Sequence, residues 1–181
     1  MVEFQSMLLK LEHELDANEV KELMFLCKDL ILPTPNIKVL FDKLQENGLL
    51  GEDNIFIIKE LLYSIRRYDL LKTEFNTQRE QMMEDMKIPG LSKIIPYRHL
   101  LYDLSLHVSN DDLSKVKHLL SNDIYISRMQ NIEDMLDIFT EMEKKAILHP
   151  DSLERLKNIM KTIDENLMEK IVKYEQSRMS F

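Results

Sequence analysis

Opposite charges crowd one short stretch of the sequence, KELLYSIRRYDLL at residues 59–71. Arg67 and Asp69 lie two positions apart, whereas side chains that face each other on one continuous helix lie three or four apart. We therefore expect one helix to end near Arg67 and the next to begin near Asp69, where the helix dipole favours an acid. A guanidinium can hold two carboxylates, and Glu19 is the expected second acid. The predicted chemistry is a charge cluster of Glu19, Arg67 and Asp69; the alternative is a surface ion pair worth about 0–1 kcal/mol.

Other residue types that carry chemistry are scattered along the chain. No histidine is paired with another at a metal-ligand spacing, although His13 with Glu12 or Glu14 is a candidate. The five stand at His13, His99, His107, His118 and His149. Cys27, in FLCKD, has apolar neighbours on a predicted helix and is expected to be a packed thiol. The sequence holds no glycine-rich phosphate loop and no GxSxG motif. We predict no catalytic, cofactor or metal site. A small helical enzyme or metal protein remains an alternative, and it would need these side chains to converge in the fold.

The composition is that of a helical, non-membrane protein. The 181 residues are 44% hydrophobic and 31% charged, with only three glycines and five prolines. No apolar run reaches the roughly 18 residues that span a bilayer, and the start MVEFQSM lacks a basic signal region. Membrane insertion is therefore not expected. The net charge is -8, with basic residues interleaved among acids, so nucleic acid is not an expected partner either. A single cysteine fits a reducing compartment, and we expect a cytoplasmic protein.

The second half of the chain repeats the first. Residues 97–108, YRHLLYDLSLHV, match FQSMLLKLEHEL, and NDDLSKVKHLLSNDI matches NEVKELMFLCKDLI. Matched residues stand 93 positions apart up to the end of these segments and 98 positions apart afterwards. The change arises because the segment around LPTPN is five residues shorter than its counterpart around YISRMQNIE. The paired apolar residues are Leu8 and Leu101, Leu11 and Leu104, Leu26 and Leu119, Ile31 and Ile124, Phe41 and Phe139, Leu44 and Met142, Leu50 and Leu148, and Ile65 and Ile163.

This duplication predicts an all-α protein made of two tandem six-helix bundles. Each unit of about 75 to 85 residues is large enough to fold alone. We place the first domain at residues 2–76 and the second at residues 97–176. Residues 77–96 would form a connecting helix, TQREQMMEDM, and a linker, IPGLSKIIP. So short a connection favours two bundles packed as a rigid pair.

The combination of FLCKD and ELLYSIRRYDLL resembles the death effector domain. The family's signatures are a Phe-Leu pair on the second helix, matched by Phe25 and Leu26, and a charge triad with an RxDL motif. Glu19, Arg67 and Asp69 match the triad. The tandem arrangement is similar to the prodomains of caspase-8 and caspase-10 and to the FLICE-like inhibitory proteins. The resemblance covers residues 2–176 and implies a death-fold architecture.

The resemblance implies a recruitment module without catalysis of its own. The expected partners are the death effector domain of FADD, other tandem death effector domain proteins and further copies of the chain, which assemble head to tail into filaments. The expected place is the cytoplasm, at death-receptor complexes, where an initiator caspase is recruited. Phe25 would pack against the second domain. The caspase motif QACxG is absent, so the chain is expected to be at most a fragment of a protease. The alternative is an inhibitor of the FLICE-like type that joins the same assembly.

The second repeat departs from the family pattern at two places. His118 and Leu119 stand at the hydrophobic patch in place of Phe and Leu. DENL at residues 164–167 replaces RxDL, although Asp112 occupies the position of Glu19. Because an aromatic side chain at the centre of an interface often dominates its energy, we predict that His118 weakens self-assembly.

Overall fold

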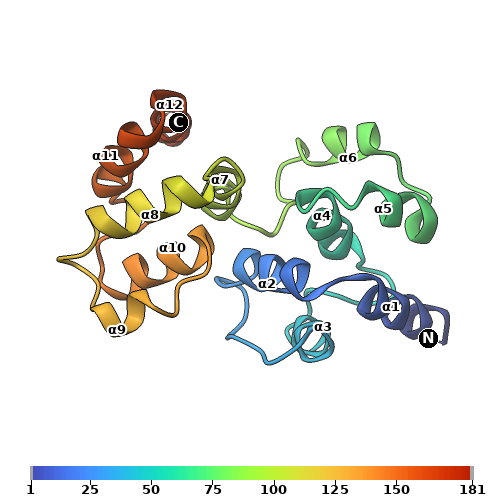
Figure 1. Cartoon of the computed structure of the whole chain (residues 1–181). Coiled ribbons are helices and arrows are strands. Elements are labelled where there is room, and N and C mark those ends of the chain that lie inside the picture. The colour runs from blue at the N-terminus through green and yellow to red at the C-terminus, as the bar shows by residue number, and fades with distance from the viewer. Residues whose placement is uncertain (1, 180–181) are drawn as a thin grey trace. The chain divides into compact units, whose positions relative to one another are not determined.

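Helices make up nearly all of the regular structure, as predicted for an all-α protein (Figure 1). The computed structural model describes residues 2–179, and in that range it has twelve helices, no strand and two isolated β-bridges. The first six helices are α1 (Val2–Glu14), α2 (Ala17–Leu26), α3 (Ile37–Glu46), α4 (Phe56–Ser64), α5 (Tyr68–Phe75) and α6 (Arg79–Asp85). The other six are α7 (Pro96–Ser105), α8 (Asn110–Leu119), α9 (Ile126–Met129), α10 (Met135–Lys144), α11 (Glu154–Ile163) and α12 (Glu165–Arg178).

The chain divides into two compact units between Ile95 and Pro96. The first holds α1 to α6, and the second holds α7 to α12. The polar segment around α6 groups with the first unit, since α6 lies against α4 and its Met82 is fully buried. The predicted domain limits 2–76 and 97–176, the connecting role of residues 77–96 and the rigid pairing stay predictions.

Side-chain caps fix where the equivalent helices α2 and α8 begin. Asp16 accepts a hydrogen bond from the backbone N–H of Glu19 at 2.7 Å, and the Glu19 carboxylate accepts one from the N–H of Asp16 at 3.1 Å. Ser109 and Asp112 make the same capping box before α8, at 3.1 and 3.2 Å. Each box satisfies two N–H groups that a helix start would otherwise leave unpaired. The repeat seen in the sequence is therefore also a repeat of helix starts.

Most apolar pairs of the repeat are core pairs. Of the eight predicted pairs, five are buried in both units: Leu8 and Leu101, Leu11 and Leu104, Phe41 and Phe139, Leu44 and Met142, and Leu50 and Leu148. Leu26 and Leu119 differ most, at 1% and 37% exposed. The two units share a core plan and differ at the end of α2 and α8.

The two sets of six helices are not the same six. Residues 32–36 hold Pro33 and Pro35 and form no helix, because proline lacks an N–H and fixes its own φ. The second unit has α9 in the corresponding place, which accounts for the change of offset from 93 to 98. The first unit has α6 instead, after its last repeated helix. The charged corner therefore joins the fourth and fifth helices of its unit.

Candidate interaction site

A left-handed residue makes the corner between α4 and α5. Arg66 has φ 64°, and its N–H bonds to the Tyr63 carbonyl at 3.1 Å, while the N–H of Arg67 reaches the Leu62 carbonyl at 2.9 Å. These two bonds are the Schellman pattern that closes a helix, with an arginine where glycine is usual. The turn places Arg67 immediately before α5 and puts Asp69 in that helix's first turn.

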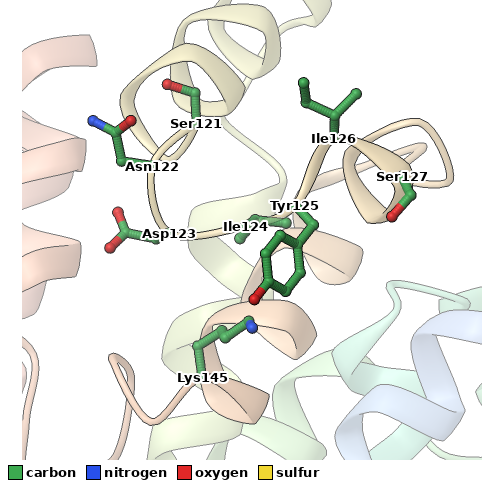
Figure 2. Close-up of a pocket in the computed structure, with 8 residues that line it drawn as sticks. All are labelled: Ser121, Asn122, Asp123, Ile124, Tyr125, Ile126, Ser127 and Lys145. Carbon is green, nitrogen blue, oxygen red and sulfur yellow. The ribbon is translucent and has the colours of Figure 1, made fainter.

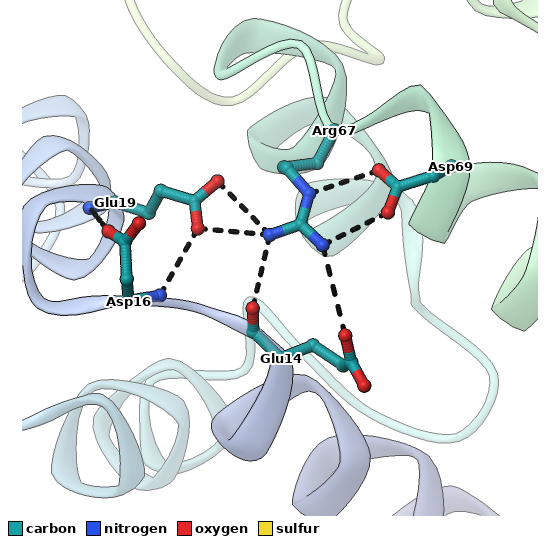
Figure 3. A network of polar contacts seen from close by, with 5 residues as sticks. All are labelled: Glu14, Asp16, Glu19, Arg67 and Asp69. Carbon is teal, nitrogen blue, oxygen red and sulfur yellow. Dashed lines mark hydrogen bonds and ion pairs between the residues drawn. The ribbon is translucent and has the colours of Figure 1, made fainter.

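The guanidinium of Arg67 joins three helices (Figure 3). Its Nε and Nη2 donate to the two Asp69 carboxylate oxygens, each at 3.0 Å. Its Nη1 lies 2.9 and 3.1 Å from the two Glu19 oxygens and donates to the Glu14 carbonyl at 3.1 Å. The structure thus brings Glu19, Arg67 and Asp69 together, with the carbonyl at the end of α1 as an added acceptor. Planar recognition of this kind needs arginine, because a lysine offers one point charge.

Glu19 serves two contacts at once. Its carboxylate accepts the N–H of Asp16 in the capping box and also binds Arg67 (Figure 3). Glu14 lies at the rim, with its carboxylate 4.0 Å from Arg67 Nη2. Sequence reasoning missed Glu14 and Asp16. Asp16 and Glu19 lie three residues apart before an apolar run, which is the sequence signal of a capping box. That signal would have predicted the contact between Asp16 and Glu19.

The cluster has a covered inner pair and exposed outer acids. Arg67 and Glu19 are 21% and 17% exposed, whereas Asp69 and Glu14 are 62% and 59% exposed. The hydrogen bonds from Arg67 lower the pKa of Asp69, and the bond to Asp69 raises the pKa of Arg67. The three carboxyl groups of Glu14, Glu19 and Asp69 outnumber the one guanidinium of Arg67. The surface of this cluster is therefore acidic.

The two predicted hydrophobic patches differ in exposure. Phe25 and Leu26 are buried, at 6% and 1% exposed. His118 is exposed and Leu119 is 37% exposed. In the first unit the Phe-Leu pair is part of the buried apolar set, and the predicted packing of Phe25 against the second domain stays a prediction. The second pair is accessible to solvent.

The second unit has no arginine at the equivalent corner. Asp164 is the sole residue between α11 and α12, and its side chain accepts the N–H of Asn166 at 2.8 Å. Where the first unit has Arg67 and Tyr68, this unit has Asp164 and Glu165, so the charged residues of this corner are acids alone. Asp112, the counterpart of Glu19, caps α8. The charge cluster is thus a feature of the first unit.

The described part of the chain offers little for covalent or metal chemistry. Cys27 is fully buried, and burial, with a smaller effect of the Glu60 charge, raises the pKa of its thiol to about 12. A thiol that stays protonated at neutral pH is a poor nucleophile. Within residues 2–179 no three His, Cys, Asp or Glu side chains gather as a metal site. In the same range no helix is both long and apolar enough to cross a bilayer.

Comparison with known proteins identifies both units. The family model for the death effector domain matches residues 4–80 and 97–177. Mouse caspase-8 is 37% identical over 97% of this chain, and the mouse CASP8 and FADD-like apoptosis regulator is 31% identical over 93%. The chain spans 38% and 35% of those two proteins.

A solved structure shows the same fold. The crystal structure of the viral FLIP MC159 matches with a TM-score of 0.82 at 22% identity, over 97% of this chain and 98% of that one. The predicted resemblance is therefore confirmed, and the matched residues hold two death effector domains and no catalytic domain. The chain belongs to the death effector domain family, as a tandem member related to caspase-8 and to the CASP8 and FADD-like apoptosis regulator.

Proposed function

We propose that this chain is a recruitment module of apoptosis that binds the death effector domain of FADD. It also assembles with other tandem death effector domains and so brings an initiator caspase to death-receptor complexes in the cytoplasm. The observation that carries the proposal is the double family match, one domain in each compact unit. Two interaction domains in one chain offer the several unlike faces that head-to-tail growth needs.

The acidic cluster supports a role in binding. Asp69 and Glu14 remain more than half exposed although both lie beside Arg67. Exposed carboxylates in excess of cations complement a basic surface on a partner and speed its association. The inner Arg67–Glu19 contact holds α2 and α5 in place, so the outer acids stand on a fixed frame. The proposed contact is between these acids and basic residues of a partner domain.

The first test is a binding measurement between the purified chain and the FADD death effector domain, alongside sedimentation of the chain alone. We expect binding that weakens with added salt, because exposed charges are screened, and assembly that grows with concentration. A well-folded chain that stays monomeric and does not bind would overturn the proposal.

Charge-neutral variants test the proposed contact surface. Asp69→Asn and Glu14→Gln should each weaken binding about two- to fivefold, since an exposed ion pair contributes roughly 0.5–1 kcal/mol. Glu46→Gln is the matched control, because Glu46 is 61% exposed and lies on α3, away from the cluster. Equal losses from all three variants would show a general effect of net charge and would remove the acidic cluster from the contact.

The inhibitory alternative has its own support in the 31% identity to the mouse CASP8 and FADD-like apoptosis regulator. An inhibitor joins the assembly without bringing an active protease. Added in excess to a reconstituted assembly of FADD and full-length caspase-8, the chain alone would lower caspase activation under either function. The discriminating measurement is the same assay with the chain titrated from small amounts, in which a recruitment module first raises caspase activation and an inhibitor lowers it at every amount.

A further inference from the structure

One tyrosine of the six stands out by its exposure. Tyr125 is 70% exposed, whereas Tyr97 and Tyr102 are 1% and 6% exposed. The remaining three, Tyr63, Tyr68 and Tyr174, are partly buried. An enzyme that acts on the phenol hydroxyl of the folded chain therefore meets Tyr125 first.

The backbone around Tyr125 is open to a modifying enzyme. Tyr125 lies before α9 in an extended conformation, with φ −61° and ψ 145°. Its neighbour Ile126 is 76% exposed, and α9 is a single turn of four residues. The Tyr125 carbonyl accepts the N–H groups of Arg128 and Met129, at 3.0 and 2.9 Å. Few contacts must open for this segment to enter an active site, since short exposed elements have low local stability.

A cation is positioned for the product of such a modification. Lys145 Nζ lies 4.5 Å from the centroid of the Tyr125 ring, and the backbone N–H of Lys145 is held by the Glu141 carbonyl at 3.0 Å. Figure 2 shows the phenol hydroxyl turned toward Lys145. Residues 121–127 and Lys145 line a hollow of about 550 Å³. The nearby Asp123 is paired with Arg155 at 2.6 Å, which reduces its repulsion of another anion.

We propose that Tyr125 is a tyrosine phosphorylation site and that Lys145 binds the phosphate. In the transfer, the phenol oxygen bonds to the γ-phosphorus of ATP, the bond from that phosphorus to the bridging oxygen breaks, and ADP leaves. The phenol proton passes to a base of the kinase. The product carries a charge of about −2 and accepts charge-assisted hydrogen bonds from an ammonium group. Phosphorylation replaces an aromatic, cationic surface at residues 125 and 145 with an anionic one.

The test is phosphorylation of the intact folded chain by tyrosine kinases with Mg²⁺ and ATP, mapped by mass spectrometry. The kinases are chosen for activity on a peptide of residues 119–131, so that the result on the chain reports on its structure. We expect most of the incorporated phosphate on Tyr125, a loss of labelling in Tyr125→Phe and unchanged labelling in Tyr174→Phe. Labelling spread over the other tyrosines, a folded chain that resists kinases active on the peptide, or a peptide that no tyrosine kinase accepts would each overturn the proposal.

The role of Lys145 has a separate readout. Phosphorus NMR follows the second ionisation of the phosphotyrosine, whose ordinary pKa is about 6. An adjacent ammonium favours the dianion, so we expect a pKa below that value in the parent and a return toward it in Lys145→Met. Equal values in the two proteins would remove Lys145 from the site, whatever the outcome of the labelling.

Discussion

Arg67 has the contacts of a structural residue and the position of a binding residue. It links the end of α1, the start of α2 and the start of α5 through five donor contacts shorter than 3.2 Å. Two of the acids that it contacts, Asp69 and Glu14, face solvent, so loss of Arg67 would disturb both the corner and the surface. These two effects separate when stability and binding are measured on the same variants.

Replacement of Arg67 should destabilise the first unit. Arg67→Ala leaves Glu19, only 17% exposed, without its guanidinium, and we expect a loss of about 1–2 kcal/mol in the free energy of unfolding. Arg67→Lys keeps the charge but not the fork, and should lose part of the same free energy. Urea unfolding measures both. Lys43→Ala removes an exposed ion pair on α3 and should change stability by less than about 0.5 kcal/mol. An Arg67→Ala chain as stable as Lys43→Ala would contradict this account.

Asp69 should make stability depend on acid. Its pKa is lowered in the folded chain, so the unfolded chain takes up a proton first as the pH falls. The stabilisation is complete above the unfolded pKa of about 3.9 and is lost as the pH drops through the lower folded value. The gap in unfolding free energy between the parent and Asp69→Asn should therefore shrink below about pH 4. Urea unfolding from pH 7 to acid measures it, and a gap that stays constant or widens in acid would be inconsistent with the Arg67 contact.

The two units end one pair of equivalent helices, α3 and α10, with different residues in the same backbone conformation. Gly48 after α3 and Ala146 after α10 stand 98 positions apart and both have positive φ, 73° and 59°. Each closes its helix with the same pair of backbone hydrogen bonds, from Gly48 and Leu49 in the first unit and from Ala146 and Ile147 in the second. The left-handed conformation is less favourable for alanine than for glycine, because the alanine Cβ comes too close to the following carbonyl oxygen.

A reciprocal exchange tests that difference. Ala146→Gly should stabilise the chain by about 0.5–1 kcal/mol, and Gly48→Ala should destabilise it by a similar amount. A Cβ at Gly48 would meet no atom within 4 Å, so the effect there comes from the backbone conformation alone. Thermal unfolding should show shifts of opposite sign, of about 2–4 °C if each change reaches 1 kcal/mol. Shifts of the same sign would exclude the left-handed turn as their cause.

Elements were easier to predict than contacts. The caps, the prolines and the period of apolar residues locate the helices, because those signals are local. The same signals occur in both halves of the chain. The meeting of Glu19 with Arg67, 48 positions apart, was predicted only as the expected partner of an arginine at a corner. The Glu14 carbonyl was missed because a backbone acceptor leaves no mark in the sequence. The one-turn α9 was also missed, since tertiary packing decides whether so short a segment forms a helix.

At the scale of the whole molecule, the two units present unlike surfaces. The first carries the acidic cluster at its α4–α5 corner and has its Phe-Leu pair buried. The second lacks the arginine and leaves His118 and Leu119 accessible. Contacts between unlike faces propagate and do not close, which suits the head-to-tail assembly that we propose for this chain. The concentration at which the chain assembles then depends on its weakest contact surface. We expect the patch of His118 and Leu119 to be that surface.

His118→Phe should strengthen self-assembly. The position is exposed at the end of α8, next to Leu119, and a phenylalanine there would add apolar area at the position that Phe25 holds in the first repeat. A gain of roughly 1.4 kcal/mol per contact would lower the concentration at which the chain assembles about tenfold. Sedimentation velocity over a concentration series measures that threshold. His107→Phe is the matched control, because His107 is also exposed but precedes α8, at the end of that helix opposite to His118. If His118→Phe assembles no more readily than the parent, the second patch does not limit growth; if His107→Phe assembles equally well, the gain is unspecific adhesion of an exposed ring.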